Sequence, residues 1–89
     1  MIERQVTIQN RLGLHARAAA KFVSLASGFA SRIELCRGNR AVNGKSILGV
    51  MMLAAGRGSN LTLKINGQDE ANAAEALECL INERFGEPE

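Results

Sequence analysis

Residues 12–17 read Leu-Gly-Leu-His-Ala-Arg and contain the only histidine of the chain, His15, with Arg17 two positions later. An uncharged imidazole is a nucleophile near neutral pH, and a guanidinium binds phosphate oxygens through its forked N–H groups. This pair predicts a site at which His15 accepts a phosphoryl group and Arg17 contacts it. On spacing alone an alternative stays open, because a single histidine before a helix is usually a surface residue or a cap. The sequence offers no serine or cysteine set that would make His15 part of a hydrolase.

A helix is predicted directly after His15, over residues 16–27, because apolar side chains recur there at helical spacing. The amides of Ala16 and Arg17 then belong to the first turn, where N–H groups lack partners inside the helix. Such amides bind anions, and the helix dipole adds to the attraction. The same positive surroundings disfavour the imidazolium form of His15, which keeps the ring nucleophilic.

The rest of the chain supplies the elements that would position this helix. Alternating apolar residues predict strands over residues 2–8, 32–35 and 61–65 and a short strand ending near Val42, and helices are predicted over 47–54 and 70–85. The order is therefore β-α-β-β-α-β-α. It favours one α+β domain over residues 1–89, an open-faced sandwich in which a four-stranded antiparallel sheet carries three helices on one face.

The composition excludes several kinds of site. No apolar stretch approaches the ~20 residues of a membrane helix and nothing resembles a signal peptide, so we expect a cytoplasmic protein without membrane insertion. Cys36 and Cys79 form no CxxC pair, and with a single histidine we expect no metal site and no other cofactor.

The charges are distributed unevenly along the chain. Residues 1–45 hold eight basic and two acidic residues, whereas residues 46–89 hold three basic and seven acidic ones. The basic half favours an acidic partner or an anionic ligand. Nucleic acid is not the expected partner, because a chain with no Trp, no Tyr and three Phe has little with which to stack on bases.

The fragment Gly44-Lys45-Ser46 has the appearance of the end of a phosphate-binding P-loop. Five residues separate Gly38 from Gly44, which is one more than that motif allows, and the chain is too short for a nucleotide-hydrolysing domain. We therefore exclude ATP binding at this fragment. Ser46 is instead predicted to cap the short helix that begins at Ile47.

With these residues in this order, the chain resembles the HPr family, the phosphocarrier proteins of the bacterial phosphoenolpyruvate-dependent phosphotransferase system. The segment "GLHARAAAKFV" is similar to the active-site segment of the family, and "KSILGVMML" is similar to its regulatory serine segment. The resemblance covers nearly the whole chain. It implies that His15 is the phosphorylated histidine and that Arg17 contacts the phosphate, next to the amide of Ala16.

The resemblance also implies partners. Enzyme I loads the histidine from phosphoenolpyruvate, and the carrier passes the group to a IIA domain of a sugar permease or a regulator. Ser46 matches the serine that an HPr kinase modifies in some bacteria. A docking surface is matched by the apolar residues of the short helix, Ile47, Leu48 and Met51; core packing is the alternative reading of these residues. Lys21 and Lys45, with Arg17, indicate that the partner surface is acidic.

The expected protein is thus a monomeric phosphocarrier, a substrate of other enzymes more than a free-standing enzyme. Two alternatives remain: a regulatory binding module that acts through its Ser46-phosphorylated form, and a small RNA-binding domain. The family usually has proline directly after the arginine, where this chain has Ala18. Alanine forms helices well, so the mechanism should survive. The departure leaves open whether the carrier serves sugar uptake or nitrogen-type regulation.

Overall fold

The computed structural model describes residues 1–89 and has the predicted order of elements. The four strands are β1 (Ile2–Thr7), β2 (Arg32–Arg37), β3 (Arg40–Asn43) and β4 (Asn60–Asn66). The helices are α1 (Ala16–Ala26), α2 (Ile47–Met51) and α3 (Glu70–Asn82), followed by a 3-10 turn, η1 (Arg84–Gly86). The predicted α+β fold is confirmed.

The strands form one antiparallel sheet in the order β1-β4-β2-β3. Strand β4 lies in the middle, where Leu63 pairs with Leu35 of β2 and Ile65 pairs with Ile33. These alternate residues are buried beneath the helices, as a period of two predicts. The other face is open and polar, and there Lys64 lies opposite Glu3 and Glu34 on the neighbouring strands.

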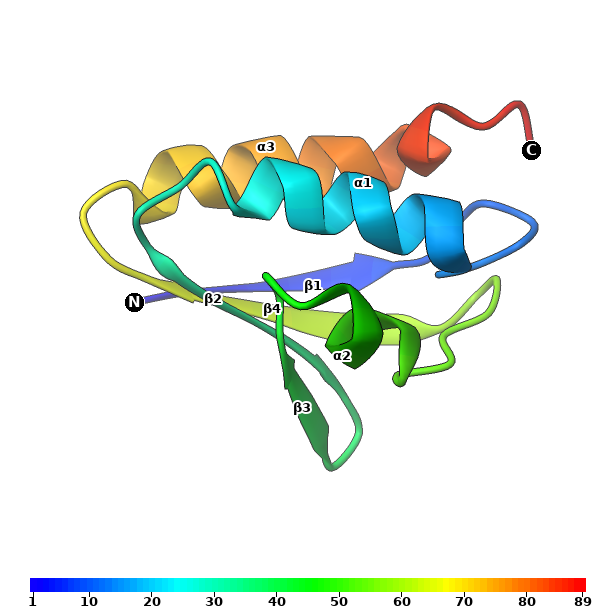
Figure 1. Ribbon diagram of the computed structural model, residues 1–89, viewed down its shortest axis with the longest axis horizontal. Coiled ribbons are helices and arrows are strands. Elements are labelled where there is room, and N and C mark those ends of the chain that lie inside the picture. The colour runs from blue at the N-terminus through cyan, green and yellow to red at the C-terminus, as the bar shows by residue number, and fades with distance from the viewer.

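The helices cover the apolar face of the sheet (Figure 1). Helices α1 and α3 lie side by side, and the shorter α2 packs against α1 and β3. Small residues on the inner side of α1, Ala18, Ala19 and Ala26, are fully buried with Phe22. Alanine favours the helix and lets its backbone lie close to the sheet. The amino end of α1 therefore has a rigid support.

Two helices end earlier than the sequence predicts. Helix α2 stops at Met51 instead of Ala54, because the N–H groups of Leu53 and Ala54 donate three residues back, to Val50 and Met51, and Ala54 has a positive φ of 50°. Arg37 donates to the carbonyl oxygens of Leu53 and Ala54, both at 3.0 Å, so the β2–β3 hairpin satisfies carbonyls that the helix end leaves unpaired.

The second difference lies at the end of the chain. Helix α3 stops at Asn82 instead of Phe85, and Arg84 and Phe85 have positive φ values of 58° and 56°. Phe85 is nevertheless fully buried. The chain turns back so that this side chain fills the core, and the segment after it runs towards the start of α1 (Figure 1).

Candidate functional site

His15 is the residue immediately before α1, and its side chain does not cap the helix. Its backbone is extended, and its carbonyl oxygen accepts the Ala19 N–H at 2.9 Å. The amides of Ala16 and Arg17 lie in the first turn and have no acceptor within the protein. Two free N–H donors therefore directly follow the imidazole-bearing residue, at the positive end of an 11-residue helix.

The turn before His15 depends on Gly13 and Asn10. Gly13 has a φ of 68°, and a Cβ there would lie 2.4 Å from the carbonyl oxygen of Ala55. Only glycine fits such a position without strain. Asn10 is fully buried and donates from Nδ2 to the Gly13 carbonyl oxygen at 2.8 Å. The turn is thus fixed against the loop after α2, which sets where His15 enters α1.

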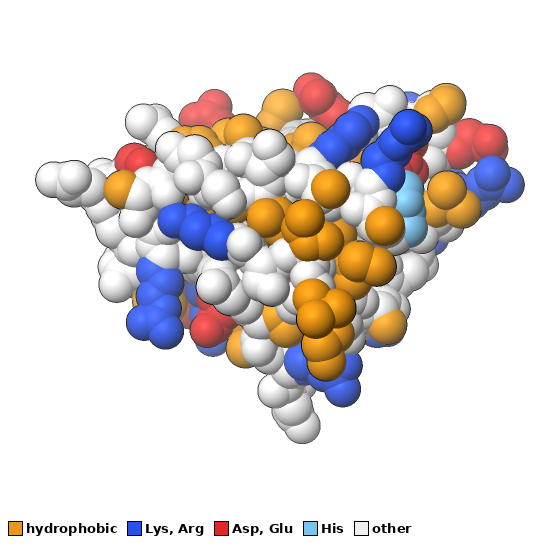
Figure 2. Space-filling view, viewed as in Figure 1, with side chains coloured by type: hydrophobic (Ala, Val, Ile, Leu, Met, Phe, Trp, Pro, Cys, Tyr) orange, Lys and Arg blue, Asp and Glu red, His pale blue; other side chains and the backbone are white.

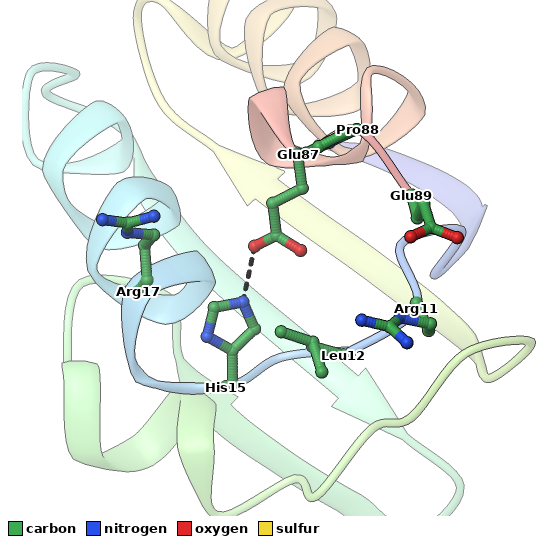
Figure 3. A pocket seen from close by; sticks show the side chains of 7 residues that line it. All are labelled: Arg11, Leu12, His15, Arg17, Glu87, Pro88 and Glu89. Carbon is green, nitrogen blue, oxygen red and sulfur yellow. Dashed lines mark hydrogen bonds and ion pairs between the residues drawn. The ribbon is translucent and has the colours of Figure 1, made fainter.

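A carboxylate lies against the imidazole. Glu87 Oε2 is 2.5 Å from His15 Nε2 (Figure 3), and Glu87 Oε1 accepts from Asn10 Nδ2 at 3.0 Å. Burial acts to raise the pKa of Glu87, but hydrogen bonds from Asn10 and His15 and the charges of His15 and Lys21 outweigh it, so this pKa lies below its ordinary value of 4.5. An ionised Glu87 accepts the Nε2 hydrogen, which leaves Nδ1 as the ring nitrogen without a partner.

The segment that carries Glu87 is held at three points. Phe85 is buried in the core, its carbonyl oxygen accepts from Lys21 Nζ at 2.7 Å, and the Glu89 carbonyl oxygen accepts the Arg11 N–H at 3.0 Å. Glu87 thereby reaches an imidazole that lies 72 positions away in the sequence.

A pocket of about 200 Å³ opens between the turn, the start of α1 and this C-terminal segment. Its lining comprises Arg11, Leu12, His15, Arg17 and residues 87–89. Arg17 is exposed and makes no hydrogen bond or ion pair within the protein. In Figure 3 the unpartnered ring nitrogen faces the α1 side, where Arg17 stands, and Glu87 takes the other nitrogen. An anion on the α1 side would meet the guanidinium and the free amides together.

An exposed apolar patch lies over α2 and extends towards the histidine (Figure 2). Its members on α2 are the three predicted docking residues, Ile47, Leu48 and Met51, of which Leu48 is 69% exposed. Leu12 and Met52 add to the exposed apolar surface at 62% and 56%, and sequence reasoning did not name them. Core packing is therefore wrong for Ile47, Leu48 and Met51, whereas Val50 on the same helix is buried. Exposed apolar patches of this kind mark interaction surfaces.

Ser46 caps α2, because its Oγ accepts the Gly49 N–H at 3.1 Å. The two predicted docking lysines already have partners within the protein: Lys45 Nζ donates to the Phe29 carbonyl oxygen at 2.7 Å, and Lys21 Nζ holds the Phe85 carbonyl oxygen as described. Of the three basic side chains predicted to meet an acidic partner, only Arg17 makes no hydrogen bond within the protein.

Sequence reasoning missed Glu87 and Asn10. Neither lies in a motif, and their approach to His15 depends on the turn at Phe85 and on the buried turn at residues 10–13. The signals in the sequence are Gly86, which follows the predicted last helix and has a φ of 79°, and the two acidic residues after it, Glu87 and Glu89. No group of three or more potential metal-ligating side chains comes together, and no helix is long and apolar enough to cross a membrane.

Comparison with known families matches residues 2–83 to the family described as "PTS HPr component phosphorylation site". This chain belongs to the HPr family. The resemblance found in the two sequence segments is thereby confirmed, and the fold is that of HPr structures. The family model covers all three α-helices, but it ends before Glu87.

Individual relatives agree. Phosphocarrier protein HPr of Cupriavidus necator is 55% identical over 89 residues, which is the full length of both chains. Phosphocarrier protein NPr of Shewanella violacea is 45% identical and covers 97% of this chain and 94% of that protein. A crystal structure of HPr-C-His from Thermoanaerobacter tengcongensis superposes with a TM-score of 0.96 at 45% identity and covers both chains completely.

Proposed function

We propose that this protein is a cytoplasmic phosphocarrier that accepts a phosphoryl group from phospho-Enzyme I on His15 and passes it to a IIA domain. The observation that carries the proposal is the arrangement at the start of α1. There an imidazole with one free nitrogen is followed by two unpaired amides and by an arginine with no partner.

The reacting atom in this proposal is His15 Nδ1. In a neutral ring that carries its hydrogen on Nε2, where Glu87 can accept it, the Nδ1 lone pair is free. As the new N–P bond forms, the bond from phosphorus to the donor breaks and its electron pair leaves with the donor. Arg17 and the amides of Ala16 and Arg17 stabilise the charge on the phosphoryl oxygens. No pocket needs to enclose the group, because both donor and acceptor are proteins.

The test is incubation with phosphoenolpyruvate and Enzyme I, followed by intact mass measurement and acid treatment. We expect the mass of one phosphoryl group on the parent, lost in acid as a phosphohistidine, and none on His15→Ala. His15→Ala removes the contact with Glu87 but leaves the core untouched, so the variant should fold, and thermal unfolding verifies this. A parent that is never loaded would instead support the purely regulatory binding module.

We also propose that Ser46 is a regulatory phosphorylation site. It precedes the exposed apolar residues of α2, so a charged group there would border the docking surface. The charge would repel an acidic partner and would have to lose water when that partner binds. Incubation with ATP and an HPr kinase should give an acid-stable phosphoserine, and Ser46→Ala should remain unmodified.

The branch served by the carrier is decided by which IIA domain accepts the group. The proposal covers either sugar uptake or nitrogen-type regulation, since the relatives include both an HPr and an NPr. Transfer from the loaded protein to IIA domains of each branch, measured side by side, identifies the partner by the faster rate.

A further inference from the structure

The His15–Glu87 contact is one link in a row of three side chains. Asn10 donates to Glu87 Oε1 at 3.0 Å, and Glu87 Oε2 meets His15 Nε2 at 2.5 Å. The exposed fraction falls along the row, from 28% for the histidine side chain to 12% for Glu87 and zero for Asn10. A carboxylate that holds one nitrogen of an imidazole, and is itself held from behind, orients the ring for chemistry at the other nitrogen.

The orientation of Asn10 shows how firmly this row is set. Its Oδ1 is buried without a partner, whereas Nδ2 donates both to the Gly13 carbonyl oxygen and to Glu87. Rotating the amide by half a turn would place Oδ1 against these two acceptors. A buried acceptor without a hydrogen bond is costly, and such costs are usually found at functional sites. Here the unpaired Oδ1 accompanies two hydrogen bonds donated by Nδ2, one of which holds Glu87.

We propose that Glu87 is a positioning residue for phosphoryl transfer through His15. The inference rests on the proposed function of the site. Glu87 keeps the ring hydrogen on Nε2, turns the lone pair of Nδ1 towards Arg17 and the start of α1, and pairs with the positive charge that the ring gains on phosphorylation.

The charges in the step balance. The N–P bond forms at Nδ1 while the Nε2 hydrogen stays on the ring, so the product is a cationic phosphoimidazole next to an anionic carboxylate. Transfer to the acceptor reverses these changes and leaves the neutral ring. Glu87 stands at Nε2, on the opposite side of the ring from the phosphoryl group. Because Coulomb energy falls with distance, it attracts the nearby ring more than it repels the phosphoryl oxygens.

The matched variants are Glu87→Ala, Glu87→Gln and, as a control, Glu75→Gln. Glutamine keeps an acceptor of the same reach without the charge. Glu75 is exposed on α3, has no hydrogen bond or ion pair and lies outside the pocket, so its change removes the same charge elsewhere. Thermal unfolding of each variant verifies the fold.

The first measurement is made on unphosphorylated protein and needs no enzyme. Nitrogen-15 chemical shifts of the His15 ring, recorded at a pH at which the ring is neutral, report the fraction of molecules with hydrogen on Nε2. We expect this fraction to be highest in the parent and the Glu75→Gln control, lower in Glu87→Gln and lowest in Glu87→Ala. Equal fractions in all four proteins would overturn the proposal, because a residue that merely packs the C-terminal segment would not move the ring hydrogen.

The second measurement is the steady-state loading of each variant by Enzyme I. A hydrogen bond to a charged group changes an equilibrium by about tenfold or more, and only the part gained at the transition state affects the rate, so kcat should fall by roughly threefold to tenfold in Glu87→Ala. Glu87→Gln should lie between Glu87→Ala and the parent, and KM should stay within about twofold, because the docking surface is intact. Unchanged or faster loading of both Glu87 variants would overturn positioning and indicate a carboxylate that obstructs the site. A parent that is not loaded at all would instead overturn the proposed function.

Discussion

Arg17 differs from Arg37 and Arg40, in the hairpin beside α2, in having a guanidinium without hydrogen bonds inside the protein. The guanidinium groups of Arg37 and Arg40 donate hydrogen bonds to carbonyl oxygens at the end of α2. Arg40 Nη1 lies 2.7 Å from the Met52 oxygen. A free forked donor at the start of a helix is prepared for phosphate without first breaking an internal bond. The reactive pair is thus ready before the phosphoryl group arrives.

Replacing Arg17 should therefore slow phosphoryl transfer more than it weakens docking. A charge-assisted contact contributes roughly 1.5–3 kcal/mol, so Arg17→Ala should lower kcat by about tenfold to a hundredfold. Arg17→Lys should recover only part of this loss, because an ammonium lacks the fork. Stopped-flow or quench-flow loading by Enzyme I gives the rates, and Arg57→Ala in the exposed loop before β4 is the control. A rate for Arg17→Ala within twofold of the control would remove Arg17 from the site.

At this scale the sequence shows the residues that are neighbours along the chain. His15 and Arg17 could be predicted because one helix start carries both. Glu87 could not, since Gly86 marks a turn but the contact also depends on positive φ values at Arg84 and Phe85, two residue types that rarely adopt them. Asn10 could be assigned to a turn from its type, but its burial and its orphaned oxygen depend on tertiary packing.

Helix α2 illustrates what the sequence predicts about an element and where that prediction stops. Ser46 before an apolar run predicted the start of the helix, and the Ser46–Gly49 hydrogen bond bears it out. Its end could not be predicted, because Ala54 adopts a positive φ and the carbonyls after Met51 are satisfied by arginines from a hairpin earlier in the chain. Capping is a local property, whereas this termination is a tertiary one.

Substitutions at Ser46 should separate capping from docking. Ser46→Ala removes the acceptor for the Gly49 N–H and should cost about 0.5–2 kcal/mol of stability. Ser46→Asp keeps an acceptor and should melt at the parent temperature or above. It should nevertheless load more slowly, because its charge borders the docking surface, and the loss should shrink at 1 M salt, where screening shortens the field to about 3 Å. Equal loading of Ser46→Asp and parent at low salt would reduce Ser46 to a plain cap.

The turn that delivers His15 should tolerate no side chain at Gly13. Gly13→Ala combines a positive φ with a Cβ placed 2.4 Å from the Ala55 oxygen. Gly38→Ala is the matched control, because its φ is also positive at 58° but a Cβ there meets nothing within 4 Å. The strain of positive φ costs about 1 kcal/mol, so Gly38→Ala should lose roughly that and Gly13→Ala distinctly more, measured by urea unfolding. If both variants lost the same unfolding free energy, the loop after α2 would have moved to make room for the Cβ at residue 13 without a further cost.

Across the whole molecule, Asp69 joins the start of α3 to the loop between α1 and β2. Its carboxylate accepts the N–H groups of Ala30 at 2.8 Å and Ser31 at 2.9 Å, and the Ser31 hydroxyl as well. The hydrogen bond from the Ser31 side chain, and then the one from the Ala30 backbone, lower the pKa of Asp69 from its ordinary value of 3.8. Asp69 thereby links the start of α3 to the loop after α1, at the end of the two helices that lies far from His15.

This link should make stability depend on pH in acid. Because the pKa of Asp69 is lower in the folded state, its contribution is complete above about 3.8 and is lost as the pH falls through that value and the lower folded one. Asp69→Asn should therefore be less stable than the parent at pH 7, and the two unfolding free energies should converge towards pH 2. Urea unfolding at each pH gives both curves. A constant gap would mean that the contacts, and not the charge, carry the effect.

The two ends of the chain lie at opposite ends of the molecule (Figure 1). The amino group of Met1 pairs with Glu70 at the start of α3, whereas Glu89 lines the pocket of the reactive histidine. A tag fused after Glu89 would thus begin at the edge of this pocket, next to the segment that carries Glu87. A polyhistidine tag there would also bring a cluster of foreign imidazoles to the only native one. A tag before Met1 would give up the ion pair with Glu70 but would lie far from the pocket, so we expect transfer rates measured with the two placements to differ.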